Sequence, residues 1–354
     1  MRPVAAGHPF PWDPYSDQPA IVRSRRLRRR LRGRSWADYA TTAAWGLTSL
    51  PLLALRAATL PRLPTPTMTE MLGVGISPLD QDPLLIRDLL DELGCRHVLA
   101  RFELRRMHRW PELLRHLQSI GRPTLAVLIQ DRAAVINPRR WRAACRAFYH
   151  LRSPIIEAVQ AGHAINRLKW GCASTHEFAP LAAIAAHAHQ RQASDIPFIS
   201  PGTIDFEPAT TFRSVCGHPR HWQADALGSA LYVDRRGGPS ACQYAVFNLE
   251  RKITTLAAIA AISPHIRNHR LWITEFNWPL AGTAPYAPTS DAECVSETQA
   301  AEHILAYLRI AQASGKVQRC YVWQLLAKGY GLIDHSSGYQ RPAWHALKQV
   351  MTQP

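Results

Sequence analysis

The sequence lacks the cysteine spacing that metal sites and disulfide frameworks require. Its 354 residues include seven cysteines, an odd number, and no two of them form a Cys-x-x-Cys pair. Zinc sites and disulfide scaffolds both need clustered or regularly spaced thiols, so neither is indicated and we expect no bound metal. Buried free thiols in a reducing compartment fit this usage better. The cysteines are Cys95, Cys145, Cys172, Cys216, Cys242, Cys294 and Cys320.

Lysine, and charge in general, is also scarce. Charged residues make up 19% of the chain and hydrophobic residues 47%, which is typical of a globular protein with one large core or two modest ones. Only five of the 42 basic residues are lysines, and such an arginine bias is more typical of genome base composition than of a binding surface. We therefore expect no specific nucleic-acid partner, despite the formal net charge of +16.

The apolar run near the amino terminus is too short to span a membrane. It covers residues 39–55, seventeen residues without a charge, whereas a spanning helix needs about 20 apolar residues. The stretch RSRRLRRRLRGRSW (23–36) precedes it, too far from the start for the charged region of a secretory signal. One interpretation is a helix docked on the body of the protein. Another is a peripheral membrane contact through residues 23–56, with arginines on anionic headgroups. Nucleic-acid binding and a cleaved targeting signal are further alternatives.

A proline-rich stretch separates this extension from the rest of the chain. LPRLPTP (60–66) has three prolines in seven residues, which is typical of a stiff linker. We therefore expect a basic extension over residues 1–67 and one folded domain over residues 68–354. Half of the net charge, +8, lies in the extension, from eleven arginines and three aspartates. Without a credible export signal, we expect a cytoplasmic protein, peripheral at the inner membrane under the membrane interpretation.

Beyond residue 71, short apolar runs alternate with amphipathic segments, which predicts alternating strands and helices. Eight strand–helix units in about 280 residues are typical of a (β/α)₈ TIM barrel. The competing fold is an open doubly wound sheet, but no Gly-x-Gly-x-x-Gly or phosphate-binding loop follows the first strand, and we expect no cofactor. The predicted strands are 71–77, 95–103, 123–131, 155–162, 196–206, 224–234, 271–279 and 317–326.

The carboxyl ends of these strands carry carboxylates, amides and aromatic rings. In a barrel of this type, functional side chains lie at those ends. Rings stack on the C–H faces of sugars, while carboxylates and amides bind hydroxyls, so the mixture predicts a carbohydrate site. The residues at or just after the ends are Arg101, Glu103, Asp131, His163, Asn166, Trp170, Asp205, Glu207, Tyr232, Asp234, Glu275, Asn277, Trp278, Trp323, Gln324 and Tyr330.

Four segments resemble those of the retaining glycoside hydrolases built on a (β/α)₈ barrel. LWITEFNWP (271–279) resembles their seventh strand, where Thr-Glu carries the nucleophile. YVWQLLAKGYGLIDHSSGYQRPAWHAL (321–347) resembles their last strand and helix. QAGHAINRLKWG (160–171) lines up with their fourth-strand segment, usually Gly-Asn-Glu-Pro-Asn followed by Trp, and DALGSALYVD (225–234) resembles their sixth strand. The similarity runs in order through residues 71–350.

The resemblance implies a role for each matching residue. Glu275 takes the place of the nucleophile, which attacks the anomeric carbon and forms a glycosyl-enzyme. Arg101 falls where these enzymes often have an arginine that keeps the nucleophile ionised, and Tyr232 where a tyrosine orients it. Trp323 takes the place of the sugar-stacking platform. The other implied substrate-binding residues are Asn166, Trp170, Asn277 and Trp278.

The fourth-strand segment departs from the family pattern at the acid/base position. Gly162 and Asn166 match, but Ala164 stands where the family has the glutamate that protonates the leaving group. His163 replaces an asparagine there, and Ala230 replaces the histidine of the sixth strand. Loss of a general acid removes a rate factor of roughly 10²–10⁴. The substitute acids that the sequence offers are His163, Asp205 and Glu207.

Three functions stay open at this point. The first is an enzyme acting on glycosidic bonds with Glu275 as nucleophile, in bacterial surface polysaccharide metabolism rather than digestion of food glycans. The second is a catalytically inactive descendant that binds carbohydrate or serves as a scaffold in polysaccharide biosynthesis. The third is a basic adaptor in which residues 1–67 act and the barrel supports them. Purely structural alternatives are an ion pair of Glu275 with Arg101 and packing of the tryptophans at the barrel mouth.

Overall fold

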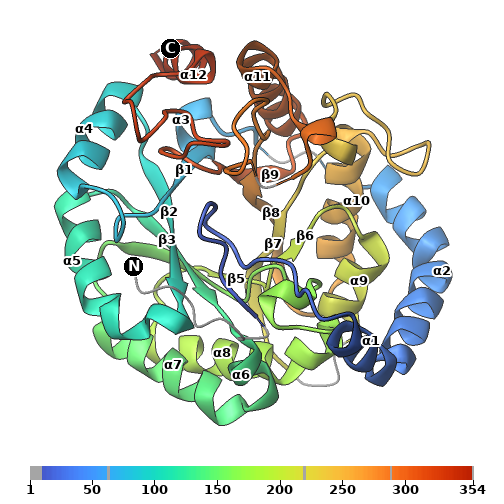
Figure 1. Cartoon of the computed structure of the whole chain (residues 1–354). Coiled ribbons are helices and arrows are strands. Elements are labelled where there is room, and N and C mark those ends of the chain that lie inside the picture. The colour runs from blue at the N-terminus through green and yellow to red at the C-terminus, as the bar shows by residue number, and fades with distance from the viewer. Residues whose placement is uncertain (1–9, 62–63, 218–220, 288, 353–354) are drawn as a thin grey trace.

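The body of the protein is a closed barrel of parallel strands surrounded by helices (Figure 1). The computed structural model describes residues 10–61, 64–217, 221–287 and 289–352. Each strand pairs in parallel with its neighbours, and the first and last strands also pair with each other. The predicted TIM barrel is therefore confirmed. Its strands are β1 (Leu72–Ile76), β2 (His97–Glu103), β3 (Thr124–Ile129), β4 (Ile156–Ala161), β5 (Phe198–Ile199), β6 (Thr203–Ile204), β7 (Ala224–Ala230), β8 (Ile266–Phe276) and β9 (Val317–Val322).

Helices cover the outside of the barrel, as the amphipathic segments predict. Their ends follow local sequence signals: Asp82 caps the helix that begins at Pro83, and Gly94 ends it in the left-handed region that glycine adopts without cost. The helices are α1 (Arg25–Arg34), α2 (Trp36–Ala58), α3 (Met68–Met71), α4 (Pro83–Leu93), α5 (Trp110–Ile120), α6 (Arg132–Ile136), α7 (Pro138–Leu151), α8 (Ala179–Gln192), α9 (Pro208–Cys216), α10 (Leu249–Ile262), α11 (Glu297–Ala313) and α12 (Pro342–Thr352).

The fifth strand differs from its prediction as one continuous run over residues 196–206. It is split into β5 and β6, which together fill one of the eight positions around the barrel. Pro201 lies between the two pieces and has no N–H for a ladder hydrogen bond. The N–H of Gly202 bonds to the carbonyl of Gly162, 2.9 Å away, instead of continuing the ladder. The short helix α9, which the sequence reasoning did not predict, follows directly.

The lumen of the barrel is filled by side chains that point inward from the strands. Among them are Leu125, Val127, Trp272 and Tyr321, all nearly inaccessible to solvent. Trp323, just beyond β9, lies against Gly75 of β1, where an added Cβ would come within 2.1 Å of the indole ring. The absence of a side chain at Gly75 is therefore what makes room for the indole.

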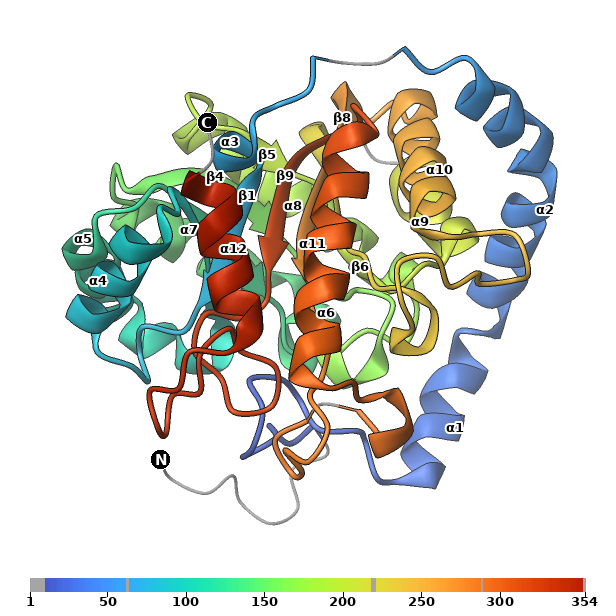
Figure 2. The same cartoon turned by 90° about the horizontal axis from the view of Figure 1, so that it is seen from above.

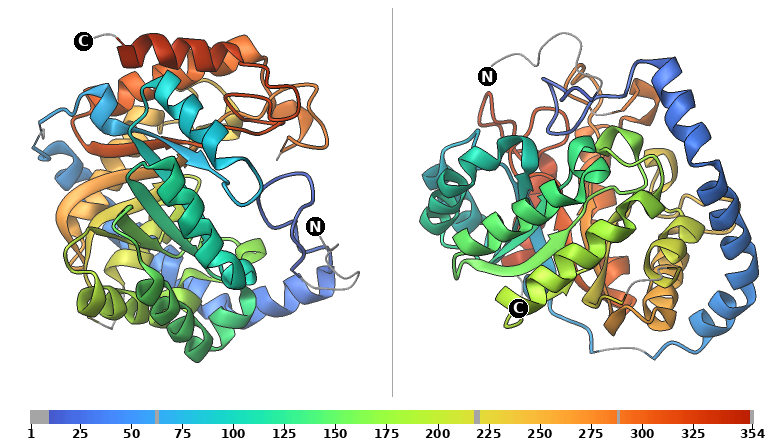
Figure 3. Two further views of the ribbon diagram at one scale, coloured as in Figure 1. Left: turned by 90° about the vertical axis from the view of Figure 1, so that its left-hand side faces the viewer. Right: turned by 90° about the horizontal axis from the view of Figure 1, so that it is seen from below.

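The basic extension lies against the barrel. Figure 2 and Figure 3 show α1 and α2 along its flank, and α2 packs against α9 and α10. The contact is close, because an added Cβ on Gly46 would meet the Cβ of Ala209 at 2.6 Å. This is the arrangement of the docked-helix interpretation. Among the described residues, no helix combines the length and apolar character needed to cross a bilayer.

Substitution of Gly75 tests the packing of the lumen. We expect Gly75→Ala to lower the free energy of unfolding by about 1–3 kcal/mol, because the new methyl group overlaps the Trp323 ring. Urea denaturation measures the change. Gly33→Ala is the matched control: that glycine lies in α1 with no atom within 4 Å of an added Cβ, so the control leaves stability unchanged or raises it. Equal effects of the two substitutions would contradict this account.

Candidate active site

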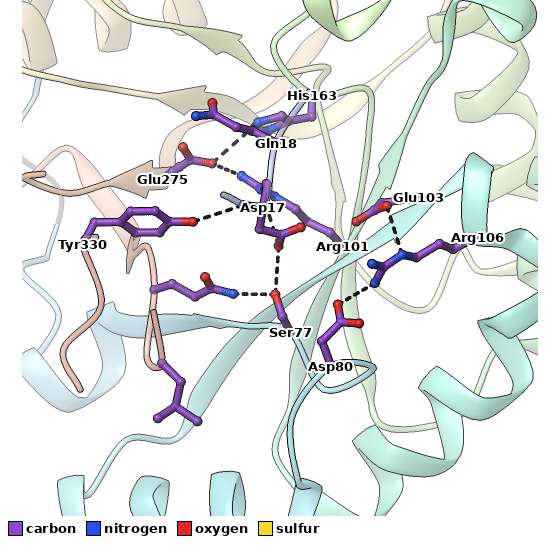
Figure 4. Close-up of polar contacts among 12 residues, drawn as sticks. Asp17, Gln18, Ser77, Asp80, Arg101, Glu103, Arg106, His163, Glu275 and Tyr330 are labelled. Atoms are coloured by element: carbon purple, nitrogen blue, oxygen red, sulfur yellow. Dashed lines mark hydrogen bonds and ion pairs between the residues drawn. The ribbon is translucent and has the colours of Figure 1, made fainter. Parts of the chain in front are cut away.

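Glu275 lies near the carboxyl end of β8, buried at the mouth of the barrel (Figure 4). One carboxylate oxygen, Oε1, accepts a hydrogen bond from the hydroxyl of Tyr232, which follows β7. The other, Oε2, accepts one from the guanidinium of Arg101 on β2. Side chains from two other strands, β7 next to β8 and β2 three positions away, thus hold one carboxylate, in the positions that the sequence assigned to nucleophile, arginine and tyrosine.

Burial and Arg101 have opposite effects on the pKa of Glu275. Burial raises the pKa of the carboxyl group, but the Arg101 guanidinium and the hydrogen bond from the Tyr232 hydroxyl outweigh it, and the pKa lies below its ordinary value of 4.5. The Arg101 guanidinium is itself stacked on the Trp323 ring, 3.6 Å from the ring centroid. Glu275 is therefore an ionised, oriented carboxylate at neutral pH, as a nucleophile must be.

The loop after β4 places His163, not an acid, beside Glu275. Gly162 begins the loop with a φ of +104° and lies so close to the Phe178 ring that a side chain would collide with it. The Nε2 atom of His163 is 3.6 Å from Glu275 Oε2. Burial and the charge of Arg101 lower the pKa of His163 to about 3, so the imidazole is neutral near pH 7. Ala164, where the family has its acid/base, is fully buried.

The other two substitute acids pair with an arginine rather than with Glu275. The guanidinium of Arg167 lies 2.7 Å from Asp205 and 2.6 Å from Glu207. Asn166 donates to Glu207 and to the carbonyl of Ile204 and accepts from the Ile204 N–H, so its amide secures the loop. Asp205 reaches the rim of the pocket around Glu275, whereas Asn166 and Glu207 do not line it.

Most of the predicted aromatic residues lie around Glu275. Trp170 and Trp323 line the pocket, together with Tyr330 and the amide of Asn277. Trp278 is the exception: its indole N–H donates to the carbonyl of Gly237 and its ring packs in the layer beneath α11, outside the pocket. The alternation of side chains along an extended strand explains this, because neighbours such as Asn277 and Trp278 point to opposite faces.

A loop of the amino-terminal extension covers the pocket, which the sequence reasoning missed. Residues 11–20 form a compact turn closed by the pairing of Trp12 with Pro19, and in Figure 1 the chain here crosses the centre of the barrel. The Asp17 carboxylate accepts a hydrogen bond from the Ser77 hydroxyl at 2.8 Å. The backbone carbonyl of Asp17 accepts another from the Arg101 guanidinium at 2.5 Å. The only available signal was compositional: two of the three acidic residues of the extension, with Trp12 and Tyr15, fall in this short stretch.

The sequence reasoning gave no role to two further polar residues near the site, Gln130 and Glu103. Gln130, after β3, donates to the carbonyls of His163 and Trp170 and thereby fixes the loop that carries both. Glu103, at the end of β2, is buried; burial and the nearby Asp17 raise its pKa to about 7, against the opposing pull of Arg105 and Arg106. It lines a small space beneath Asp17 and not the pocket around Glu275.

The covered pocket is small, but a larger groove adjoins it. With the loop in place, the space around Glu275 is about 150 Å³. Small-molecule sites usually occupy roughly 300–1,000 Å³. The adjoining groove, of about 580 Å³, shares Lys169 and Trp170 with the pocket and is also lined by Trp12, Arg105 and Asp131. Over the described ranges, no cluster of His, Cys, Asp and Glu side chains is suited to hold a metal ion.

Comparison with solved structures finds the same architecture in glycoside hydrolases. The chain superposes on a monomeric β-xylosidase from Caulobacter crescentus CB15 with a TM-score of 0.61 and 16% identity, over 81% of this chain and 69% of that one. A GH39 enzyme from Xanthomonas axonopodis pv. citri superposes with a TM-score of 0.58 and 16% identity, over 80% of this chain and 66% of that one. A family 1 β-glucosidase from Thermotoga maritima superposes with a TM-score of 0.54 and 10% identity, over 82% of this chain and 100% of that one. This likeness establishes the fold.

Sequence comparison adds no closer relative. No protein-family model matches the chain, and no curated protein sequence does. The chain spans about two thirds of the length of the xylosidase and of the GH39 enzyme. The barrel thus shares its fold with these glycoside hydrolases at low sequence identity.

The Arg101–Glu275 pair provides a stability test. We expect Arg101→Met to destabilise the fold by about 3–5 kcal/mol at pH 7, because it leaves a buried carboxylate without its cation. The pKa of Glu275 then rises in the variant. Its loss of stability relative to the natural protein therefore becomes smaller as the pH falls and the folded variant takes up a proton. The double variant Arg101→Met with Glu275→Gln recovers much of the loss, since no buried charge is left. Denaturant titrations at several pH values measure the natural protein, each single variant and the double variant.

A matched control uses the exposed pair Arg87 and Asp88 on α4. Arg87→Met changes the stability by less than about 1 kcal/mol, because exposed ion pairs contribute little. Strictly additive effects of the two substitutions at Arg101 and Glu275 would contradict the coupling of these side chains.

Proposed function

We propose that the protein binds a carbohydrate at the barrel mouth and that Glu275 attacks its anomeric carbon. The observation that carries the proposal is the state of this carboxylate: ionised, held by Arg101 and Tyr232, and facing a pocket lined by Trp170 and Trp323. The indole N–H of Trp170 is buried and has no hydrogen-bond partner among the described residues.

The chemistry that these residues support is the first half of a retaining mechanism. The carboxylate of Glu275 forms a bond to the anomeric carbon, and the bond to the leaving group breaks, with its electron pair going to the leaving group. Neither Ala164, which replaces the acid, nor the neutral His163 beside Glu275 supplies a proton. Lys169, which lines the pocket and whose pKa burial lowers to about 8, is the remaining proton donor there. The substrates that we propose are therefore sugars with weakly basic leaving groups, which need little help from an acid.

The adjoining groove gives room for more than one sugar unit. It begins at Trp170, where the edge of Trp12 meets the indole in a T-shaped contact with centroids 5.8 Å apart. The Arg105 guanidinium lies over the Trp12 ring, 3.8 Å from its centroid. Aromatic rings with flanking arginines favour a glycan that carries acidic groups. A surface polysaccharide or its activated precursor, handled in the cytoplasm, is the substrate class that we propose.

The second candidate function is carbohydrate binding without turnover. The missing acid/base and the loop over the pocket favour it, since both lower the rate of any reaction at Glu275 and neither prevents recognition. The two candidates share the pocket and differ in whether Glu275 ever forms a covalent bond, which is the quantity to measure.

Covalent trapping of Glu275 distinguishes the two candidates. We expect a panel of 2-fluoro glycosides with dinitrophenolate leaving groups to label the protein at Glu275, because such leaving groups need no proton. Neither Glu275 nor His163 changes its charge above about pH 5, since the pKa of Glu275 lies below its ordinary value and that of His163 is about 3. We therefore expect a level labelling rate from about pH 5 until Lys169 in the pocket, with a pKa of about 8, begins to lose its proton. Intact-protein mass spectrometry and peptide mapping identify the labelled residue.

Glu275→Gln is the control, because it keeps the shape and removes the nucleophile. Labelling that persists in this variant contradicts the assignment of Glu275. Absence of labelling in the natural protein, together with saturable sugar binding in calorimetry, establishes the binding function instead.

The loop over the pocket makes a separate prediction. Asp17→Ala removes the hydrogen bond to Ser77 and weakens the contact with Arg101, so we expect it to expose the pocket and speed labelling of Glu275 several-fold. Asp88→Ala, which removes an exposed carboxylate on α4, leaves the rate unchanged. A slower rate in Asp17→Ala would instead assign the aspartate to substrate binding.

A further inference from the structure

The outer face of α2 is apolar and exposed. Of seventeen large hydrophobic side chains that are exposed in the described chain, seven lie on this one helix. Two of the seven, Tyr39 and Trp45, also contact the barrel through the Ala173 carbonyl and the Phe212 ring. The other five, which we call the outer face, are Trp36, Leu47, Leu50, Leu52 and Leu55. Leu47 is 70% exposed and Trp36 is 69% exposed, whereas Leu53 on the inner side is buried against the barrel. A monomeric protein rarely keeps such a patch in water without a partner for it.

A strongly cationic helix continues this apolar face. Only Ser35 separates α1 from α2, and seven of the eight arginines between Arg23 and Arg34 are exposed, the eighth being half-buried. Within the described ranges none of these arginines forms a salt bridge. Leu31 is the one buried side chain of α1. The arginines thus present unneutralised charge to whatever covers α2.

We propose that α1 and the outer face of α2 dock the protein on the surface of an anionic lipid bilayer. The arginines would contact lipid phosphates, and the outer face would enter the boundary between headgroups and acyl chains. The other face of α2 stays on α9 and α10, where the Trp45 ring lies beside Phe212 and beneath the Arg213 guanidinium. The barrel is therefore held at the surface, and no segment needs to cross the bilayer.

The combination of charge and apolar surface favours a bilayer over other partners. A nucleic acid would use the arginines and leave the leucines of α2 in water. A symmetric dimer through the same surface would cover the leucines but bring a second arginine-rich helix to the interface, at a cost in repulsion. An anionic bilayer satisfies both features, because it has negative charge at its surface and an apolar layer just beneath.

Vesicle co-sedimentation of the full chain tests the proposal. We expect binding to vesicles of phosphatidylcholine with phosphatidylglycerol, weakened by salt, and little binding to phosphatidylcholine alone. Substitution of Arg25, Arg26, Arg29 and Arg30 by Gln should weaken binding on the order of a hundredfold or more, because each basic residue near an anionic surface adds appreciable affinity. Leu47→Ser with Leu50→Ser should weaken it comparably. These side chains are exposed, so the variants fold.

The matched control is Leu84→Ser with Leu85→Ser, a pair of comparably exposed leucines on α4. It should leave vesicle binding unchanged. Quenching of tryptophan fluorescence by brominated lipid should fall in Trp36→Phe, which places α2 in the bilayer.

Three results would overturn the proposal. The first is equal binding of neutral and anionic vesicles or of the arginine variant and the natural protein. The second is tight binding of duplex DNA that the arginine variant loses, without binding to any vesicle. The third is a dimer in analytical ultracentrifugation that Leu47→Ser with Leu50→Ser abolishes, again without vesicle binding.

Discussion

The ion pair between Arg101 and Glu275 is the interaction on which the site depends. It joins β2 to β8 across the mouth of the barrel, and only a closed barrel brings these strands together. Both side chains are buried, so each charge is stable only while the other is present. Trp323 lies over the guanidinium, and Gly75 leaves the space that the indole needs. Gly75 thus makes room for Trp323, Trp323 positions Arg101, and Arg101 in turn binds Glu275.

The same electrostatics make His163, Asp205 and Glu207 poor substitutes for an acid at the position of Ala164. Arg101 stabilises negative charge at Glu275 and opposes positive charge at His163, so the histidine stays neutral where a proton donor would be useful. Asp205 and Glu207 are drawn to Arg167 at the rim. Arg101 thus keeps Glu275 ionised, and Arg167 holds Asp205 and Glu207 at the rim.

Much of this could be predicted from the sequence, and the reasons differ by element. Seven of the eight strand positions follow from short buried apolar runs. The remaining one, the fifth, is split at Pro201. The strand-end rule selected Arg101, Tyr232 and Glu275 as candidates, and their pairing was expected from the resemblance to retaining glycoside hydrolases. Trp278 was misplaced because a strand end fixes where a residue lies but not which face its side chain takes. The loop over residues 11–20 has no periodicity, and its position depends on side chains far away in the chain, such as Ser77.

The extension belongs to both the covered pocket and the charged surface, and this limits how either can be studied. Its loop ends at Ala20 and α1 begins at Arg25, so four residues join them, a linker of at most about 14 Å when extended. Val22 in that linker is buried, which anchors the connection on the barrel. A large movement of α1 must therefore move the loop that covers Glu275. Deletion of residues 1–67 removes the cover and the arginines together, so its effects cannot be assigned to one of them. Single substitutions in the loop or on the outer face of α2 separate the two contributions, because their contacts with the barrel do not overlap.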